Sequence, residues 1–401
     1  MTRLFINSLA ASAGGGLTYI RNVIPQLASA SDLQVVIALS HDLRNEFCSF
    51  TNIDFVTLEG SSARRFWREQ AELPGLIRHY SAEVLVSAGN FATRNSPVPQ
   101  ILLSRNSIYT SDDFYHDLLL RHEYRSWLAT HLTGWLAKRS ITWADVTVAP
   151  SEAFAAELRC WSGKPVRAIH HGFDLQAFSD DHSPLAAEVE QKLQGTEGCL
   201  KLLFVSHYNY YRNFETLFRT LPLLRRRLGG QDIKLLLTCK LARGENPGSY
   251  DPASAARLVR ELGVSDLVLE LGAIPYRQLH QLYGRADVYV TPAYTETFAH
   301  PLVEAMAIGL PIVASDLPTH REICGDAALY FSRFSAQELS DRIVELASSA
   351  DLRARLSSAS RARSATFSWK KHVDELLSLV RSLADSGKRF SSNGRPPEKP
   401  Q

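Results

Sequence analysis

Several features are scarce in this sequence, and each scarcity excludes a class of protein. The five cysteines are scattered without a CxxC pair, so neither a disulfide framework nor a cysteine-ligated zinc site is expected. No apolar run reaches the roughly 18 residues that a membrane-spanning helix needs. A basic excess is also missing, since 44 Lys and Arg face 42 Asp and Glu, which argues against a general nucleic-acid binder.

The first residues lack the apolar stretch of a secretory signal. They read MTRLFINSLA and enter a strand pattern at once, so we expect a cytoplasmic protein with reduced cysteines. Two segments that interleave basic and aromatic residues, Ser61–Gln70 and Arg125–Arg139, suit contact with the surface of a membrane. The alternative is that their tryptophans (Trp67, Trp127 and Trp135) pack into a domain core.

Short apolar runs alternate with helical patterns along the whole chain. Runs this uniformly apolar are typical of parallel strands that are buried on both faces. Their alternation with helices predicts an α/β fold with right-handed crossovers. The expected strands are 4–7, 33–39, 84–89, 100–104, 146–150 and 166–172 in the first half, and 200–206, 233–239, 267–272, 288–293 and 311–316 in the second.

One interruption divides this alternation into two doubly wound, Rossmann-like domains. A chain of 401 residues exceeds what one core usually supports, so we expect a first domain over 1–178 and a second over 199–366. The polar stretch 179–198 has no strand pattern and is interpreted as a linker. The amphipathic pattern over 367–384 predicts a helix, and the tail 385–401 has nothing to bury and is expected to be disordered.

Two acids flank a turn in the stretch ETFAHPLVEAMAIGLPIVASD, which follows an apolar strand. Pro301 suits the first turn of a helix, so the loop Thr297–His300 leads into a helix N-terminus. Ligands of open α/β sheets bind beyond the carboxyl ends of the strands, where free N–H groups attract phosphate or sugar oxygens. Glu296 precedes the turn and Glu304 lies about one helical turn inside, so both can face one crevice. Helix capping by the acids is the alternative.

From Val268 to Phe331 the sequence resembles the nucleotide-binding core of the group 1 (family 4) glycosyltransferases. The E-x7-E pair, the EAMAIGLPIVASD that follows and the E…GDAALYF stretch stand in register. Ile169–Phe178 resembles the segment that closes the first domain in this family, with His171 where Asn is usual. Phe367–Val373 resembles the Trp-led helix that crosses back to that domain. The resemblance implies the GT-B fold, with two Rossmann-like domains facing across a cleft.

The same resemblance implies a retaining enzyme that uses a nucleotide diphosphate sugar. Glu304 would accept hydrogen bonds from the ribose, and Glu296 would hold hydroxyls of the transferred sugar. The backbone amides around Phe298, Ala299 and His300 would contact the sugar and the diphosphate. The usual Gly-Phe-Gly of the family is Thr-Phe-Ala here, which leaves the backbone less freedom.

A second set of candidates follows the strand 200–206. The family carries an Arg and a Lys there to neutralise the leaving diphosphate, and this sequence has His207 and Arg212 at the matching positions. An imidazole is only partly protonated near neutral pH, so we expect weaker charge stabilisation or a pH-dependent role for His207. The alternative for Arg212 is an ordinary solvated cation at the start of a helix.

The first domain supplies further candidates. Gly14, Gly15 and Gly16 follow the first strand and would let the backbone approach the donor phosphates, although they fit a plain tight turn as well. Many relatives carry a donor-contacting His where this sequence has Arg105 and Asn106. Asn106 can bond a sugar hydroxyl but cannot act as a base, and Arg105 suits an anionic acceptor.

We therefore expect a glycosyltransferase that moves a sugar from a nucleotide diphosphate donor, GDP-mannose or a UDP-hexose, to a glycan or glycolipid. The expected context is cell-surface polysaccharide or lipopolysaccharide synthesis at the inner face of the membrane. No metal or cofactor is expected, because cationic side chains and amides can stabilise the leaving diphosphate and no Asp-x-Asp motif ends a strand. An inactive nucleotide- or glycan-binding protein and a nucleotide-sugar epimerase remain alternatives. A dinucleotide oxidoreductase would need a G-x-G-x-x-G motif, which is missing.

Overall fold

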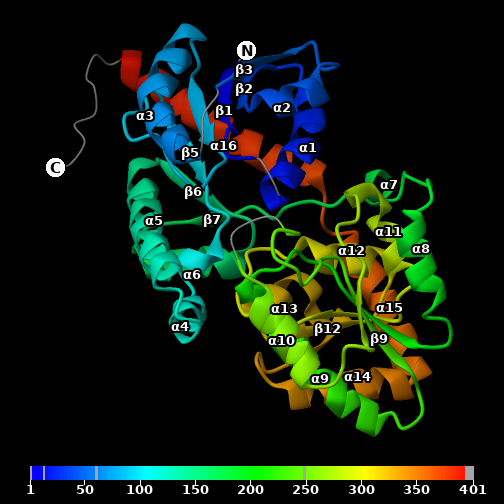
Figure 1. Ribbon diagram of the computed structural model, residues 1–401. Coiled ribbons are helices and arrows are strands. Elements are labelled where there is room, and N and C mark those ends of the chain that lie inside the picture. Colours follow the sequence, from blue (N-terminus) through cyan, green and yellow to red (C-terminus); the bar gives the residue numbers. More distant parts are fainter. Residues whose placement is uncertain (1, 12–13, 59–61, 247–249, 393–401) are drawn as a thin grey trace. The chain divides into compact units, whose positions relative to one another are not determined.

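A computed structural model describes residues 2–11, 14–58, 62–246 and 250–392 (Figure 1). Its internal contacts divide the chain into two units, and neither is continuous in sequence. Unit 1 comprises Met1–Thr110, Tyr124–Gly172 and Ser368–Gln401, and unit 2 comprises Ser111–Glu123 and Phe173–Phe367.

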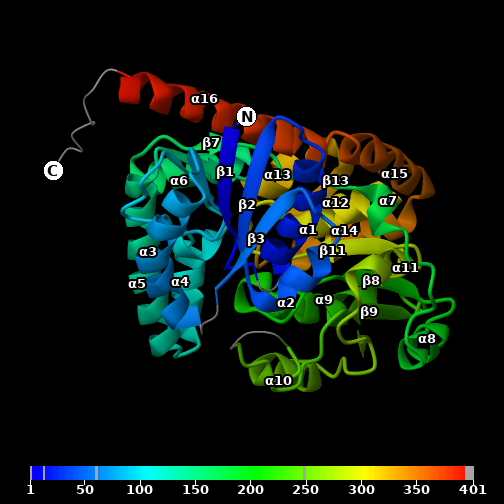
Figure 2. The same ribbon diagram turned by 90° about the horizontal axis from the view of Figure 1, so that it is seen from above.

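Unit 1 is built on a seven-stranded parallel sheet in the order β3-β2-β1-β4-β5-β6-β7. Its strands β1, β2 and β3 lie side by side (Figure 2). All strands of the sheet overlap expected apolar runs except the edge strand β3, where Asp54 interrupts the run and only Ile53 is buried. The strands are β1 (Thr2–Asn7), β2 (Leu33–Leu39), β3 (Ile53–Thr57), β4 (Val84–Ser87), β5 (Gln100–Leu103), β6 (Val146–Ala149) and β7 (Arg167–Ala168).

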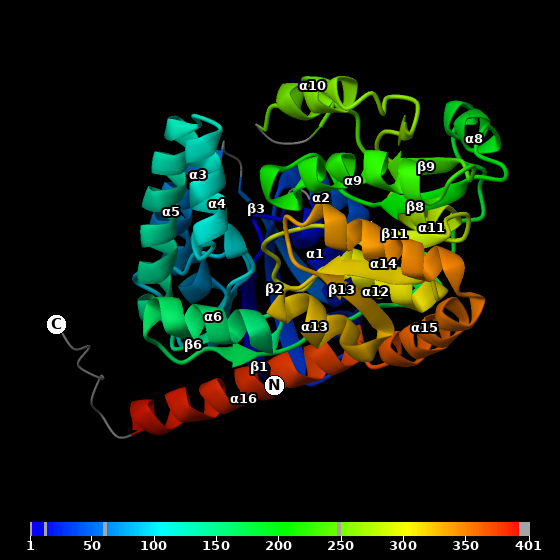
Figure 3. The same ribbon diagram turned by 90° about the horizontal axis from the view of Figure 1, so that it is seen from below.

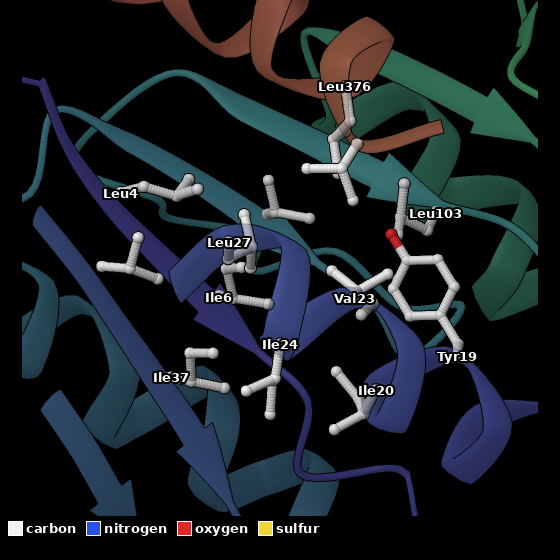
Figure 4. Close-up of a cluster of buried hydrophobic side chains, with 14 of the residues drawn as sticks. Leu4, Ile6, Tyr19, Ile20, Val23, Ile24, Leu27, Ile37, Leu103 and Leu376 are labelled. Atoms are coloured by element: carbon white, nitrogen blue, oxygen red, sulfur yellow. The ribbon is translucent and has the colours of Figure 1, made fainter. Parts of the chain in front are cut away.

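The main core of unit 1 lies between its first strands and two helices that are far apart in sequence. Ile6 and Ile37 of the sheet meet Val23 and Leu27 of α1 and Leu376 of α16 (Figure 4). Burying each such side chain contributes about 1.5–3 kcal/mol, so the last helix is an integral part of this unit. The helical elements are α1 (Gly14–Ala28), α2 (His41–Arg44), η1 (Asn45–Phe47), α3 (Ser62–His79), η2 (Ser107–Tyr109), α5 (Tyr124–Trp143), α6 (Glu152–Ser162) and α16 (Trp369–Ser392).

Unit 2 contains a six-stranded parallel sheet in the order β10-β9-β8-β11-β12-β13. The strand order therefore reverses between β8 and β11. Helices α12 and α14 both contact β12, and α14 lies beside β13 (Figure 3). The short strand β13 lies in the GDAALYF motif and was not among the expected strands. The strands are β8 (Leu200–Phe204), β9 (Ile233–Leu237), β10 (Val268–Glu270), β11 (Val288–Thr291), β12 (Ile312–Ser315) and β13 (Ala328–Phe331).

Ten α-helices are described in unit 2, together with three 3-10 turns. The helices are α4 (Asp112–Leu120), α7 (Leu175–Phe178), α8 (Ala187–Gln194), α9 (Phe214–Arg227), α10 (Ala253–Glu261), α11 (Leu279–Tyr283), α12 (His300–Ile308), α13 (Pro318–Cys324), α14 (Ala336–Ser348) and α15 (Ala350–Ser364). The turns are η3 (Tyr210–Arg212), η4 (Tyr276–Gln278) and η5 (Gly325–Ala327).

The structure changes the expected domain boundaries. The stretch 179–198 is not a free linker, because Val189 and Leu193 lie four residues apart on α8 and are buried in the core of unit 2. Residues 111–123 belong to unit 2, although they were expected in the first domain. Helix α16 continues to Ser392, so the tail expected from 385 begins as helix, and 393–401 lie outside the described residues.

The chain crosses between the units at Gly172 and again at Ser368, and these two points touch within unit 1. A Cβ at Gly172 would overlap the backbone of Trp369, so only glycine fits there. Nearby, Nδ1 of His372 bonds to the carbonyl of His170 over 2.9 Å, which leaves Nε2 to accept from the hydroxyl of Tyr19 over 3.1 Å. Close backbone contact and a buried hydrogen-bonded pair thus fix the start of α16.

Candidate active site

Two loops of unit 2 leave its sheet at the point where the strand order reverses. Strands β8 and β11 are parallel neighbours, so the loops after them emerge at the same edge, which is the usual ligand site of such sheets. The first loop carries η3 and ends at Arg212, and the second carries Glu296. The backbone N–H of Tyr294 donates to the carbonyl of Tyr211 over 3.1 Å and joins the two loops.

Arg212 and Glu296 meet between these loops. Nη1 of Arg212 donates to Oε1 of Glu296 over 2.6 Å, and the two side chains keep only 19% and 10% of their exposure. Burial alone would lower the pKa of Arg212, but the Glu296 carboxylate more than offsets this and the pKa lies above its usual value. Nε of Arg212 is buried and has no hydrogen-bond partner among the described residues. Arg212 is therefore a permanently charged hydrogen-bond donor that Glu296 holds in place, and not a solvated surface cation.

Asn213 fixes the backbone directly after Arg212. Its φ of 54° is left-handed, a conformation that Asn adopts more readily than most residues. Its Nδ2 donates to the carbonyl of Pro292 over 3.0 Å, and its Oδ1 accepts from the Thr216 hydroxyl over 2.8 Å. This side chain is a second link between the two loops, and sequence reasoning gave it no role.

The turn before α12 keeps a left-handed backbone without glycine. Ala299 has φ 63° where the family usually has Gly, a conformation that costs a residue with a Cβ roughly 1–2 kcal/mol. No side chain caps the start of α12, Pro301 in its first turn has no N–H, and the N–H of Leu302 donates to the carbonyl of Ala299 over 2.9 Å, so what this turn offers an anion is the positive end of the helix dipole. The ring of Phe298 is buried against Phe367, with centroids 5.5 Å apart, so only its backbone can face a ligand. The His300 ring lies 4.9 Å from that of Phe298.

Glu304 was expected to face a crevice, but the structure buries its side chain. Its side chain is buried because α12 is enclosed on most sides, and Oε2 accepts from the hydroxyl of Tyr283 over 2.8 Å. Burial raises the pKa of Glu304 to about 7. The pKa of the buried Tyr289 is influenced by three charges, those of Arg212, Glu304 and Glu296. These three residues therefore lie near one side chain.

Two histidines lie near the pair. His207 follows β8 and its ring is partly buried. This burial, together with the Arg212 cation, lowers the pKa of His207, so the imidazole is mainly neutral at pH 7 in the ligand-free protein. His320 of α13 is fully buried, and burial lowers its pKa as well. Its Nδ1 bonds to the Ser315 carbonyl over 2.9 Å, and its Nε2 has no partner among the described residues. Sequence reasoning missed His320, whose only signal is its position just after the PIVASD strand.

The remaining candidates belong to unit 1. Gly14, Gly15 and Gly16 begin α1, and a Cβ at Gly16 would lie 3.4 Å from Cα of Ala11, so close backbone approach is real at that position. Asn106 already accepts from the N–H of Ile108 over 3.3 Å and caps η2.

Arg105 is held inside unit 1 without an acidic partner among the described residues. Its guanidinium lies 4.5 Å above the Tyr19 ring and donates through Nη2 to the carbonyl of Ala88, and burial lowers its pKa. Its Nε and Nη1 have no hydrogen-bond partner within the part of the chain that the structure describes. Two nitrogens of a buried cation thus lack a partner among the described residues and could donate to an anion.

A cavity of about 540 Å³ opens at the opposite edge of the unit 2 sheet, where Leu200, Val288 and Pro311 stand at the beginnings of strands. It is separate from the loops that follow those strands, although Tyr283 lines it and also bonds to Glu304. Within the described ranges, no group of three or more His, Cys, Asp or Glu side chains is arranged to hold a metal ion.

Two doubly wound sheets of this kind define the class of GT-B folds, and solved structures show that this chain has that fold. Sucrose-phosphate synthase from Thermosynechococcus elongatus matches with a TM-score of 0.75 at 18% identity, over 96% of this chain and 100% of that one. Anabaena HepE in complex with UDP-glucose matches with 0.71 at 16% identity, over 96% and 100%. WaaG, a glycosyltransferase involved in lipopolysaccharide biosynthesis, matches with 0.64 at 15% identity, over 94% and 99%.

The family follows from the sequence. A family model described as "Glycosyl transferases group 1" matches residues 187–363, and one described as "Glycosyltransferase Family 4" matches 13–177, so the chain belongs to the group 1, family 4 glycosyltransferases. The D-inositol 3-phosphate glycosyltransferase of Saccharomonospora viridis is 28% identical over 248 residues, 59% of this chain and 56% of that protein. That of Mycolicibacterium smegmatis is 34% identical over 160 residues, 36% of each. The chain thus spans about half the length, or less, of these relatives.

Proposed function

We propose that this protein is a retaining, metal-independent glycosyltransferase that uses a nucleotide diphosphate sugar. The observation that carries the proposal is the Arg212–Glu296 pair at the strand-order reversal, beside the uncapped start of α12. Arg212 and the positive end of the α12 dipole supply positive charge for a diphosphate, and Glu296 supplies an acceptor for sugar hydroxyls. A ligand that carries both phosphates and hydroxyls satisfies all of these groups.

In the proposed reaction the bond from the anomeric carbon to the diphosphate oxygen breaks, and the acceptor oxygen bonds to the same carbon from the same face. The acceptor proton passes to the departing phosphate oxygen, so no side-chain base is needed and the configuration is retained. Negative charge grows on the diphosphate as its bond breaks, and Arg212 with the positive end of the α12 dipole stabilises that charge where a metal ion would otherwise be required.

We assign the ribose hydroxyls to Glu304. A ribose hydroxyl donates best to a charged carboxylate, and the pKa of about 7 means that about half of the Glu304 side chains carry a proton at neutral pH. Donor binding then draws a proton off Glu304, so affinity for the nucleotide rises with pH up to about this value.

GDP-mannose or a UDP-hexose is the proposed donor, and a glycan or glycolipid of cell-surface polysaccharide or lipopolysaccharide synthesis is the proposed acceptor. The names of the relatives support an acceptor with negative charge, since inositol 3-phosphate carries a phosphate. Arg105, with two unpartnered guanidinium nitrogens, is a side chain of unit 1 that suits such a group.

A panel of nucleotide sugars tests this proposal. The donor is expected to raise the midpoint of thermal unfolding, because a ligand that binds only the folded protein stabilises it. The same donor should be hydrolysed slowly without acceptor. Binding without hydrolysis or transfer would identify an inactive binding protein, and conversion of the free nucleotide sugar into an isomer would identify an epimerase. No shift with any nucleotide or nucleotide sugar would refute the proposal.

We further propose that the protein acts at the cytoplasmic face of a membrane and that α5 makes the contact. One face of this helix presents apolar side chains that are each between 55% and 62% exposed, namely Tyr124, Leu128, Leu132 and Trp135. Packing into the core is thus wrong for Trp135, as it is for Trp67 on α3, whereas Trp127 is half-buried.

The charge of α5 favours an anionic lipid surface over other partners. Arg125, Lys138 and Arg139 are exposed on this helix, and its sequence contains no acidic residue. Apolar side chains flanked by cations suit the boundary between lipid headgroups and acyl chains. No described helix is long and apolar enough to cross a membrane.

Vesicle sedimentation tests this surface. The protein should bind vesicles that contain phosphatidylglycerol, and Leu128→Asp with Leu132→Asp should weaken binding at least about tenfold, since each buried Leu contributes roughly 1.5–3 kcal/mol. Leu175→Asp, at an exposed leucine of unit 2, is the matched control and should bind as the wild type does. Equal binding by the double variant, or self-association through α5 instead of vesicle binding, would contradict the assignment.

A further inference from the structure

Helix α4 packs on unit 2 although the elements before and after it in sequence belong to unit 1. Its apolar side, Phe114 and Leu118, is fully buried. The Phe114 ring meets the ring of Tyr211 edge-on, with centroids 6.2 Å apart. The residue after Tyr211 is Arg212, so α4 is anchored directly beside one half of the proposed catalytic pair.

A chain of polar contacts joins α4 to both catalytic loops. The hydroxyl of Tyr294 donates to Oδ2 of Asp117 over 2.8 Å, and Nε of Arg121 donates to Oδ1 of the same carboxylate over 2.8 Å. Nη2 of Arg121 then donates to Oε1 of Glu215 over 2.8 Å. The charged side chains keep no more than 20% of their exposure, so each depends on its partners.

Two more contacts complete the arrangement. The Arg121 guanidinium lies 4.3 Å above the ring of Tyr210, and the Tyr210 hydroxyl donates to Glu123 over 3.0 Å. Tyr210 and Tyr211 lead directly into Arg212, and Tyr294 precedes Glu296 by two residues. The contacts of α4 therefore converge on the backbone that carries the pair.

We propose that α4 is a positioning element of the active site and that Asp117 and Arg121 are its positioning residues. They touch neither Arg212 nor Glu296 in any contact described above, but they hold the loops on which those two side chains stand. This inference rests on the proposed function, since it takes Arg212 and Glu296 to be the groups that act on the donor. Small displacements of such groups are expensive: roughly 1 Å can cost about 10²-fold in rate.

The helix offers a matched control for the experiment. Asp113 also lies on α4 and forms an ion pair of 2.8 Å with Arg333, which is outside the two catalytic loops. Asp117→Asn and Tyr294→Phe should lower kcat between about 10- and 100-fold while the KM for the donor changes less than about twofold. Asp113→Asn, the same substitution on the same helix, should leave both parameters close to those of the wild type.

A double variant of Asp117 and Arg212 shows whether Asp117 acts by positioning the loops or only by stabilising the fold. If Asp117 acts through the loops, Asp117→Asn should cause little further loss of kcat in an Arg212→Ala background, because residues that act as a unit are not additive. Fully multiplied losses, or a lower unfolding midpoint with unchanged kcat in Asp117→Asn, would overturn the proposal.

A second measurement does not depend on the reaction. Amide hydrogen exchange over residues 205–213 and 291–299 should be faster in Asp117→Asn than in Asp113→Asn, because the loops lose a support. A wild-type protein with no transfer activity would refute the proposed function, while the exchange result would still decide whether α4 holds the loops. Equal exchange in the two variants would refute the role of α4.

Discussion

The two units share a strand order but use the ends of their strands differently. β1 and β4 of unit 1 occupy the same places as β8 and β11 of unit 2, on either side of the reversal. In unit 1, Asn7 at the end of β1 donates to the buried carboxylate of Glu69 over 3.0 Å, which is an internal packing contact. In unit 2 the corresponding loops carry Arg212 and Glu296. The same topology therefore holds a structural polar pair in one unit and a proposed catalytic pair in the other, so the fold alone does not fix the function.

The largest expected effect breaks the pair in unit 2. Arg212→Ala should lower kcat by roughly 10²-fold, about 3 kcal/mol, because it removes a charge whose contact strengthens as the diphosphate leaves. Glu69→Gln in unit 1 is the counterpart and should leave kcat near the wild-type value. Steady-state kinetics of the two variants decides the matter, and an active Arg212→Ala would place the diphosphate elsewhere.

Buried acids provide the next comparison, because burial raises the pKa of both Glu69 and Glu304. A raised pKa means that the folded protein holds the proton more tightly, so Glu304 makes the free energy of unfolding fall as pH rises from about 4.5 to about 7. Glu304→Gln should remove this fall and be more stable than the wild type at pH 8, by up to about 3 kcal/mol. Denaturant unfolding between pH 4 and pH 8 measures it.

The two acids should differ in ligand binding. Glu304→Gln should weaken nucleotide affinity and abolish its rise with pH, whereas Glu69→Gln should bind as the wild type does. Titration calorimetry at several pH values separates them. Unchanged affinity in Glu304→Gln would mean that this carboxyl is a structural group like Glu69.

The next prediction is about His207, which stands where the family usually carries a charged Arg. Its pKa is lowered in the ligand-free protein, so it aids departure of the diphosphate only when it is protonated in the donor complex. Activity should fall as pH rises through the pKa in that complex, and His207→Arg should remove this fall, with a gain of up to about tenfold at alkaline pH. A pH profile of kcat that is identical in the variant would exclude the role.

The smallest effect concerns the strained turn before α12. Ala299→Gly should be neutral or stabilise the protein by up to about 1 kcal/mol, since it relieves a left-handed alanine but adds freedom to the unfolded chain. Ala307→Gly, in the right-handed last turn of α12 and similarly buried, should cost up to about 1 kcal/mol. Thermal unfolding of the two variants compares them, and equal losses would show that Ala299 is not strained.

Sequence patterns predicted the sheets well because strands buried on both faces are continuous apolar runs. They missed two edge strands: β3, where Asp54 breaks the run, and β13, whose central residues Leu329 and Tyr330 are only half-buried. They identified Arg212 and Glu296 as candidates, and the structure brings these two together.

The missed features depend on contacts between distant parts of the chain. Nothing local shows that Phe114 and Leu118 pack on unit 2, because an apolar side with that spacing suits any core. The burial of Glu304 depends on Tyr283, 21 positions away, and the unpaired nitrogen of His320 depends on everything packed around α13. Such properties emerge only when the whole unit is assembled.

The interrupted path of the chain bears on how this protein can be recombined with its relatives. Unit 2 needs residues 111–123 as well as 173–367, so a hybrid joined at Gly172 would combine the catalytic loops of one parent with the α4 of another. Its Tyr294 hydroxyl and Tyr211 ring would then meet foreign side chains in place of Asp117 and Phe114. Exchange of donor specificity between family members should therefore succeed only when the short segment 111–123 travels with the second half of the chain.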